Sequence, residues 1–307
     1  MTVPRVTVIL PCFDEARRVP QTVAAFLSSL PDDLSLLVVD DGSTDGTAES
    51  ALAAAGGSPR VRVKKLPANQ GKGAAVRAGM LDAAGELLVF TDADGSYGPA
   101  DVLRVADALA REPVAIGTRG EAPGGGPLPR RLASRGFNYA VRRMLALPYS
   151  DTQCGLKGFR RDAAHAIFSR TRMDGYAFDA EVLFLASRLG LGVAEVPVEP
   201  EARSGSKVRI VGDAVQMLKE MSVVRRLAAK GAYDLPRADL DSPPDAAQPT
   251  HGPRTNTATP RLNRPAEIAS TLAASWGRRR STPASSNGNG KSPSRPRGTE
   301  KYQVDKR

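Results

Sequence analysis

The sequence predicts an α/β fold built on a mostly parallel sheet. Short apolar runs of strand length alternate four times with helical patterns in the N-terminal part of the chain. The runs are almost continuously hydrophobic, as expected of strands buried on both faces. Polar clusters follow the runs, and in open parallel sheets ligands bind beyond the carboxyl ends of the strands. We therefore expect the functional site at that edge of the sheet.

Each element is expected from its own pattern. Strands are predicted at Val6–Leu10, Leu36–Val39, Val61–Leu66 and Leu87–Thr91, followed by helices after Pro20, from about Thr44, over Ala74–Ala84 and after Pro99. Beyond a strand at Val114–Ile116 the order changes. There we expect a Gly/Pro loop at Pro123–Pro129, helices near Leu132–Leu145 and over Phe178–Leu189, a strand at Val193–Val198 and a last helix near Asp213–Lys230.

Composition divides the chain after residue 235. From Pro236 onward the sequence holds ten of the 24 prolines, together with Ser, Thr, Asn and Gly runs. Such a segment cannot bury a core, so we predict one folded domain over 1–235 and a disordered, basic, Pro/Ser-rich tail over 236–307. The net charge of +10 divides into +3 and +7 at this boundary. The tail can contact anionic lipid or nucleic acid, or simply remain solvated.

Several function classes are excluded by composition. Cys12 and Cys154 lie far apart without metal-ligand spacing, which favours a reducing, cytoplasmic location. His165 and His251 are the only histidines, too few for a histidine metal site or a Ser-His-Asp triad. The folded part carries no stripe of alternating basic and aromatic residues, so we expect no nucleic-acid binding. No apolar window reaches about 18 residues, so we expect no signal peptide or membrane-spanning helix.

Two carboxylates follow the fourth predicted strand. Asp92 and Asp94 are two positions apart, so in an extended chain their side chains face the same side. Two hard oxygen ligands suit Mg²⁺ or Mn²⁺, which prefers carboxylates together with substrate phosphates. The sequence therefore predicts a metal–diphosphate site here, and the alternative is that Asp94-Gly95 is only a turn.

Two further clusters have both structural and functional interpretations. Ser43 or Thr44 can cap the helix after the second strand, while one of the preceding carboxylates, Asp40 or Asp41, can bind a base or ribose. The stretch Asn69–Gly73 places Lys72 near a helix N-terminus, a reasonable place for an anion. It completes neither the P-loop motif nor the dinucleotide fingerprint.

Together these stretches resemble the nucleotide-sugar half of family 2 glycosyltransferases of GT-A fold. The matching segments are Pro11–Glu15, Val38–Thr47, Asn69–Gly79 and Asp92–Tyr97, in this order. Further on, Asp151–Lys157, Phe178–Leu183 and Gly205–Val208 resemble polyprenyl-phosphate sugar synthases, and are more similar to dolichyl-phosphate glucosyltransferases than to the mannosyl enzymes. The resemblance covers about residues 4–230. Two features depart from the family: the dolichyl glucosyl enzymes carry an N-terminal membrane anchor, which is not expected here, and the predicted tail has no counterpart in them.

The resemblance implies roles for particular positions. The positions that hold the nucleoside are Pro11, Phe13, Glu15, Val39 and Asp41, and those of the metal and diphosphate segment are Asp92, Ala93 and Asp94, with Ser96 as a further ligand. The positions that receive the donor diphosphate or acceptor phosphate are Arg119, Arg130, Ser134 and Lys207. The implied partners are a nucleotide-sugar donor, UDP-glucose or GDP-mannose, and a polyprenyl phosphate.

The acceptor decides the mechanism. A lipid monophosphate is already anionic at neutral pH and needs no base, whereas a sugar hydroxyl would need one, for which Asp151 or Asp179 is available. Three functions stay open: an inverting hexosyltransferase to polyprenyl phosphate, a transferase to a hydroxyl of a small molecule or polysaccharide, and a non-enzymatic nucleotide-sugar-binding module. Peripheral contact with the inner face of the cell membrane is expected through the last helix. This helix carries an apolar stripe of Met217, Leu218, Met221, Val224, Leu227 and Ala228. The alternative to membrane contact is that the stripe packs into the core of the protein.

Overall fold

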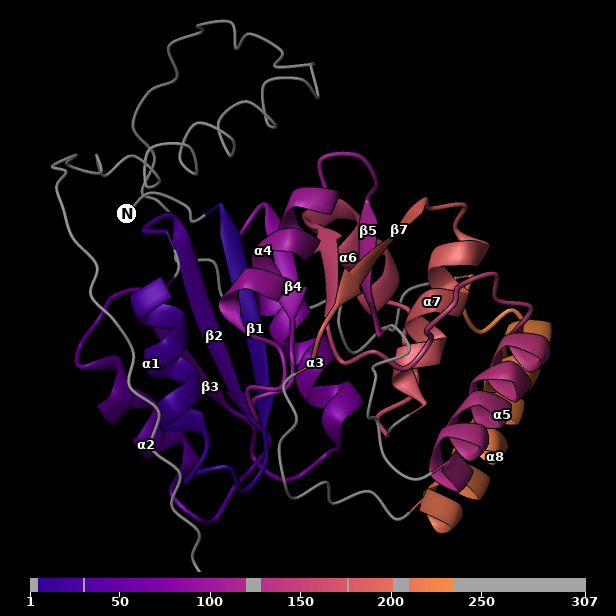
Figure 1. The fold of residues 1–307 in the computed structure, drawn as a ribbon, viewed down its shortest axis with the longest axis horizontal. Coiled ribbons are helices and arrows are strands. Elements are labelled where there is room, and N and C mark those ends of the chain that lie inside the picture. The colour runs from indigo at the N-terminus through magenta and orange to yellow at the C-terminus, as the bar shows by residue number, and fades with distance from the viewer. Residues whose placement is uncertain (1–4, 30, 120–127, 176, 201–209, 235–307) are drawn as a thin grey trace, which may run out of the picture. The chain divides into compact units, whose positions relative to one another are not determined.

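A seven-stranded sheet forms the centre of the protein. The computed structural model describes residues 5–29, 31–119, 128–175, 177–200 and 210–234. The strands are β1 (Val6–Cys12), β2 (Leu34–Asp40), β3 (Val61–Lys65), β4 (Leu87–Phe90), β5 (Val114–Arg119), β6 (Lys157–Arg160) and β7 (Val193–Val198). Their order in the sheet is β3-β2-β1-β4-β6-β5-β7 (Figure 1). The α/β class and the mostly parallel sheet are confirmed.

One strand runs against the others. β6 pairs antiparallel with β4 on one side and with β5 on the other, and Lys157 lies opposite both Phe90 and Ile116. All the other strand pairs of the sheet are parallel. Because β6 is reversed, the loop that precedes it reaches the edge at which β4 and β5 end.

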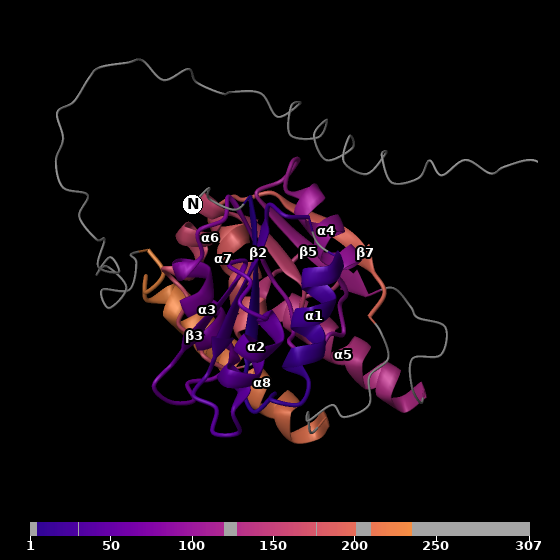
Figure 2. The same cartoon turned by 90° about the vertical axis from the view of Figure 1, so that its left-hand side faces the viewer.

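Helices cover both faces of the sheet. They are α1 (Val19–Ser29), α2 (Thr47–Ala55), α3 (Lys72–Asp82), α4 (Pro99–Ala108), α5 (Leu128–Leu145), α6 (Arg161–Phe168), α7 (Phe178–Arg188) and α8 (Ile210–Ala229). Figure 2 shows α1 and α4 on one side of the sheet and α3 and α6 on the other. Neighbouring residues of β1 enter different cores, since Ile9 packs with Met80 of α3 while Val8 packs with Phe26 of α1. The continuous apolar strands are thus buried on both faces, as predicted.

The sequence pattern predicted no strand or helix between α5 and α7, but the structure has two short elements there. β6 has the sequence Lys-Gly-Phe-Arg, which contains no apolar run, and α6 has only eight residues. β6 is nevertheless held from both sides, by hydrogen bonds to β4 and β5, and Phe159 is fully buried. Tertiary pairing therefore overrides the weak local pattern.

The start of α2 also differs from the prediction. Gly46, in the left-handed region at φ 85°, is the N-cap residue, and the helix begins at Thr47 rather than near Thr44. Capping by Ser43 or Thr44 was wrong, because the Ser43 hydroxyl instead accepts a hydrogen bond from the backbone N–H of Asp14 at 3.0 Å. Asp45 receives the first N–H of the helix, from Thr47, at 3.1 Å.

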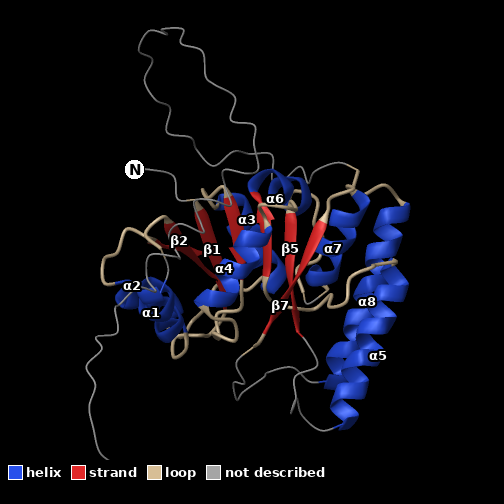
Figure 3. Cartoon of the chain, turned by 45° about the horizontal axis from the view of Figure 1, so that its top comes forward, coloured by secondary structure: helices blue, strands red, loops and turns tan. Residues whose placement is uncertain are grey.

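α5 and α8 lie side by side at the edge of the fold beyond α7 (Figure 3). Met221 and Val224 of α8 are fully buried, which confirms core packing for these two residues of the predicted apolar stripe. The side chains of Met217 and Leu218 and the whole of the predicted tail lie outside the described residues. Among the described residues, every helix is too short or too polar to cross a membrane.

Candidate active site

The four polar clusters predicted to share one edge of the sheet are linked to one another. The backbone N–H of Asp41 donates to the carbonyl of Cys12 at 2.8 Å, which joins the ends of β1 and β2. The Asp41 carboxylate accepts the backbone N–H groups of Gln70 and Gly71 at 2.9 and 2.8 Å. Lys72 then reaches Asp92, with 2.6 Å between Nζ and Oδ1. The predicted convergence of the clusters is confirmed.

The two neighbouring aspartates at the end of β2 have different roles. Asp40 is fully buried, and its Oδ1 accepts the backbone N–H of Ser43 at 2.9 Å, so it shapes the turn. Both oxygens of Asp41 hold the Asn69–Gly73 loop. Burial raises the pKa of the Asp41 carboxyl above its ordinary value, although these two N–H groups act in the opposite direction. Its predicted contact with a nucleoside stays a prediction.

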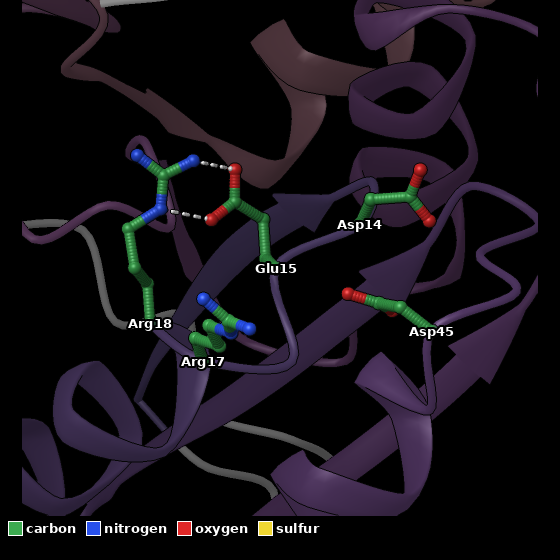
Figure 4. A pocket seen from close by; sticks show the side chains of 5 residues that line it. All are labelled: Asp14, Glu15, Arg17, Arg18 and Asp45. Atoms are coloured by element: carbon green, nitrogen blue, oxygen red, sulfur yellow. Dashed lines mark hydrogen bonds and ion pairs between the residues drawn. The ribbon is translucent and has the colours of Figure 1, made fainter. Parts of the chain in front are cut away.

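A pocket of about 320 Å³ opens beside the end of β1 (Figure 4). Its lining is entirely charged and consists of Asp14, Glu15, Arg17, Arg18 and Asp45. The guanidinium of Arg18 binds both oxygens of Glu15 at 2.5 Å, so the Glu15 carboxylate is held in one orientation. The neighbouring residue Phe13 is 41% exposed, and exposed aromatic side chains can stack on a base.

Two other positions predicted to hold the nucleoside are adjacent in the sheet. Pro11 of β1 and Val39 of β2 are register partners near the carboxyl ends of their strands. The sheet therefore brings together residues that are 28 positions apart in sequence and places them close to the charged pocket.

The predicted metal segment follows β4 in a turn rather than as an extended strand. β4 ends at Phe90, and Gly95 has a φ of 73°, so strand alternation does not orient Asp92 and Asp94. Instead the carbonyl of Ala93 accepts the Thr22 hydroxyl at 2.8 Å, and Asp94 Oδ1 accepts the backbone N–H of Ser96 at 2.9 Å. The turn explanation and the functional one are therefore compatible.

Asp92 is held between a cation and a glycine. Its Oδ1 pairs with Lys72, and the Lys72 ammonium also lies 5.5 Å from the centre of the Phe178 ring. On the other side, a Cβ placed on Gly155 would lie only 2.1 Å from Asp92 Oδ2. Only glycine therefore fits at position 155 while Asp92 keeps this place.

The donor set fits a magnesium or manganese ion that shares its coordination with a diphosphate. Asp92 and Asp94 supply hard oxygen ligands, and the Asp92 carboxylate already binds a cationic group in this structure. Among the described residues there is no group of three or more His, Cys, Asp or Glu side chains that could hold a metal ion. A metal at Asp92 and Asp94 would therefore need further ligands from the substrate, and the metal–diphosphate site stays a prediction.

The loop before β6 carries the stretch Asp151–Lys157, here named the acceptor-side motif, to the same edge. Arg119, the last residue of β5, forms a two-pronged ion pair with Asp151 at 2.7 and 2.9 Å. Burial acts to raise the pKa of the Asp151 carboxyl, but the Arg119 guanidinium outweighs this effect and holds that pKa below its ordinary value. The Arg119 side chain is still 41% exposed, so it can receive a phosphate while it is paired.

Asp179, the other carboxylate considered as a base, is also paired. Lys157 at the start of β6 is fully buried and donates to Asp179 Oδ1 at 2.5 Å and to the carbonyl of Cys154 at 2.6 Å. Lys157 is the last residue of the acceptor-side motif, and no role was predicted for it. A single lysine in a polar stretch does not indicate burial. The ion pair between Lys157 and Asp179 cannot be predicted without the positions of β6 and α7 in the fold.

Three predicted site residues lie outside the described part of the site. Arg130 and Ser134 belong to α5, but their side chains are not among those that the structure describes. Lys207 falls in the segment 201–209, which is also outside it. Their roles toward the diphosphate or the acceptor phosphate stay predictions.

Comparison with known proteins identifies the class. Residues 7–168 match the model of glycosyl transferase family 2, and the chain belongs to this family of enzymes. It is 35% identical over 239 residues to a dolichyl-phosphate beta-glucosyltransferase of Drosophila melanogaster, covering 71% of this chain and 73% of that protein. An undecaprenyl-phosphate mannosyltransferase of Micrococcus luteus is 33% identical over 223 residues, covering 69% of this chain and 91% of that protein.

Solved structures agree on the fold. A glucosyl-3-phosphoglycerate synthase of Mycobacterium tuberculosis, in complex with Mn²⁺, uridine-diphosphate-glucose and phosphoglyceric acid, superposes with a TM-score of 0.56 at 20% identity. The match covers 76% of this chain and 81% of that one. Another structure of the same synthase contains Mg²⁺ and uridine diphosphate. The GT-A-like fold is therefore confirmed.

Proposed function

We propose that this protein transfers a hexose, glucose from UDP-glucose, to a polyprenyl phosphate with inversion at the anomeric carbon. One observation carries the proposal: both acceptor-side carboxylates considered as a general base are already engaged, Asp151 by Arg119 and Asp179 by Lys157. A hydroxyl acceptor needs a base, whereas a lipid monophosphate with a second pKa of about 6 is an anionic nucleophile at neutral pH. The names of the relatives, which include dolichyl and undecaprenyl phosphate, support the same acceptor class.

In this mechanism the protein mainly positions and neutralises charge. Asp92 and Asp94 would hold Mg²⁺ or Mn²⁺, which would neutralise the departing nucleoside diphosphate. Arg119 carries a half-exposed guanidinium beside the loop that precedes β6, where it would bind the acceptor phosphate. Arg130 and Lys207 would add positive charge. With the donor diphosphate and the acceptor phosphate held together, an oxygen of the acceptor phosphate attacks the anomeric carbon directly. The nucleoside diphosphate leaves from the opposite face of the sugar.

Contact with a membrane follows from the acceptor. Lys219, Arg225 and Arg226 are exposed on α8, Lys230 is exposed directly after this helix, and Arg143 is exposed on the neighbouring α5. Basic residues near an anionic bilayer contribute about 1 kcal/mol each to binding. We therefore propose a peripheral position at an anionic, cytoplasm-facing membrane surface. Sedimentation with anionic but not with zwitterionic vesicles is the expected result, and equal sedimentation with both contradicts it.

The activity is tested by following labelled sugar. Purified protein and Mg²⁺ or Mn²⁺ are incubated with radiolabelled UDP-glucose or GDP-mannose, with and without polyprenyl phosphate, and label extracted into organic solvent is counted. We expect label there only with UDP-glucose and lipid, and none with Asp94→Asn. Transfer from GDP-mannose alone would overturn the choice of donor. Donor binding or hydrolysis without any lipid product would overturn the acceptor, and the hydroxyl-acceptor alternative would then be tested.

A further inference from the structure

Lys72 occupies an unusual electrostatic position. It is the first residue of α3, and its Nζ lies 2.6 Å from Asp92 Oδ1, with the two side chains 25% and 33% exposed. Positive charge at a helix N-terminus is disfavoured by the helix dipole, so this lysine does not serve the helix. The same ammonium lies 5.5 Å from the centre of the Phe178 ring, so it is held between α7 and the carboxylate. A lysine cation therefore lies directly against a carboxylate assigned to the metal.

The backbone around Lys72 is fixed by its neighbours. Gly71 and Gly73 lie so close to residues 173–174 that a Cβ at either position would be within about 2.6 Å of a backbone carbonyl oxygen. The N–H of Gly73 donates to the carbonyl of Asp174 at 2.7 Å, and Asp41 holds the N–H groups before Lys72. The lysine is thus delivered to Asp92 from a rigid support rather than from a loose loop.

We propose that Lys72 is a built-in countercation that competes with the divalent metal for Asp92 and makes metal binding depend on the donor diphosphate. The inference rests on the metal site of the proposed function. A divalent ion and an ammonium group repel each other when they share the same carboxylates, so the metal binds weakly to the protein alone. A bound diphosphate adds negative charge, which lets Lys72 turn from Asp92 to a phosphate oxygen while the metal takes its place.

The test measures metal binding without turnover. Free Mn²⁺ is followed by its electron paramagnetic resonance signal during titration of the full chain, with and without UDP and with no acceptor. We expect Lys72→Met to bind Mn²⁺ about tenfold more tightly than the unmodified protein when UDP is absent, the change expected from removing one competing charge-assisted contact. We also expect UDP to strengthen Mn²⁺ binding less in the variant than in the unmodified protein.

Matched variants separate this effect from a change in net charge. Lys64 forms an ion pair of similar length with Asp82, at 2.8 Å, on β3 and α3 away from Asp92, so Lys64→Met removes the same charge and should leave Mn²⁺ binding unchanged. Lys72→Arg keeps the charge and should bind Mn²⁺ as weakly as the unmodified protein. Lys72→Gln is a second neutral variant in case the methionine variant does not fold.

The outcomes also separate this inference from the proposed function. Equal or weaker Mn²⁺ binding in the neutral Lys72 variants without UDP overturns the competition, while UDP-dependent binding in the unmodified protein still supports the metal site. If the unmodified protein binds no Mn²⁺ even with UDP, the metal site of the proposed function fails, and the competition fails with it.

Discussion

Replacing Gly155 by alanine would place a methyl group against the carboxylate of Asp92. The added Cβ would lie 2.1 Å from Oδ2 and 2.8 Å from Cγ, whereas ordinary contacts begin at 3.4 Å, so the carboxylate must move by about 1.3 Å. Such a shift breaks the pair between Asp92 and Lys72 and displaces one of the two proposed metal ligands. A contact between a carboxylate and a cation contributes about 1.5–3 kcal/mol. Loss of the contact between Asp92 and the metal should therefore weaken binding of the donor together with its metal about ten- to hundredfold.

Titration calorimetry of UDP binding in the presence of Mn²⁺ measures this loss, and thermal unfolding reports on the fold. Two matched variants isolate the cause. Gly98→Ala, at a φ of −81°, introduces a Cβ with no atom within 4 Å and should change neither property. Gly158→Ala places its Cβ 2.7 Å from a Val105 methyl group and should lower the unfolding temperature without weakening UDP binding. Donor binding by Gly155→Ala as tight as that of Gly98→Ala would refute the reasoning.

Four further predictions concern the carboxylates of the site. Asp94→Asn should abolish transfer while UDP binding without metal, measured by calorimetry, is retained; substantial turnover would remove Asp94 from the proposed metal site. Since the pKa of Asp151 is below its ordinary value of about 4, this carboxylate does not titrate between pH 5 and 8. The acid limb of kcat/KM for the lipid should lie near pH 6, the second pKa of a phosphate, and should stay there in Asp151→Asn; a limb that disappears in this variant would restore Asp151 as a base. The pairing of Arg119 with Asp151 stabilises the fold above pH 4, and this contribution should be lost in urea unfolding as the pH falls below that value. Asp179→Asn leaves the buried Lys157 ammonium without its counterion and should cost about 3–5 kcal/mol of unfolding free energy in urea; a cost below about 1 kcal/mol would contradict the pair.

Much of the fold is predictable because, in its N-terminal half, the local sequence pattern and the tertiary packing favour the same structure. The strands β1, β2 and β4 are apolar on both faces, and each is followed by a helix whose pattern agrees with its packing, so local and tertiary preferences coincide. β6 breaks this consistency, because Lys157 and Gly158 stand where an apolar run would be expected. Gly158 fits there because the side chains of Val105 and Leu109 come close to its Cα, which only the packed α4 reveals.

The donor side of the site was predictable for a related reason. In a parallel sheet every strand ends at the same edge, so polar residues that follow apolar runs must converge, and the contacts from Asp41 to the Asn69–Gly73 loop and from Lys72 to Asp92 bear this out. The partner of each charge was not predictable. Lys72 lies 20 residues before Asp92, and nothing in the spacing indicates that its ammonium takes the position expected for a metal.

The acceptor side depends on the reversal of a single strand. Because β6 is antiparallel to β4 and β5, residues 151–156 return to the edge where those strands end, and this return brings Asp151 to Arg119 and Gly155 to Asp92. The same reversal buries Lys157 between the sheet and Asp179 of α7. One short strand thus engages both candidate bases in ion pairs and fixes Asp92, a carboxylate of the proposed metal site. An acceptor that brings its own negative charge is the chemistry that remains compatible with such a site, and this is why a lipid phosphate is favoured over a hydroxyl.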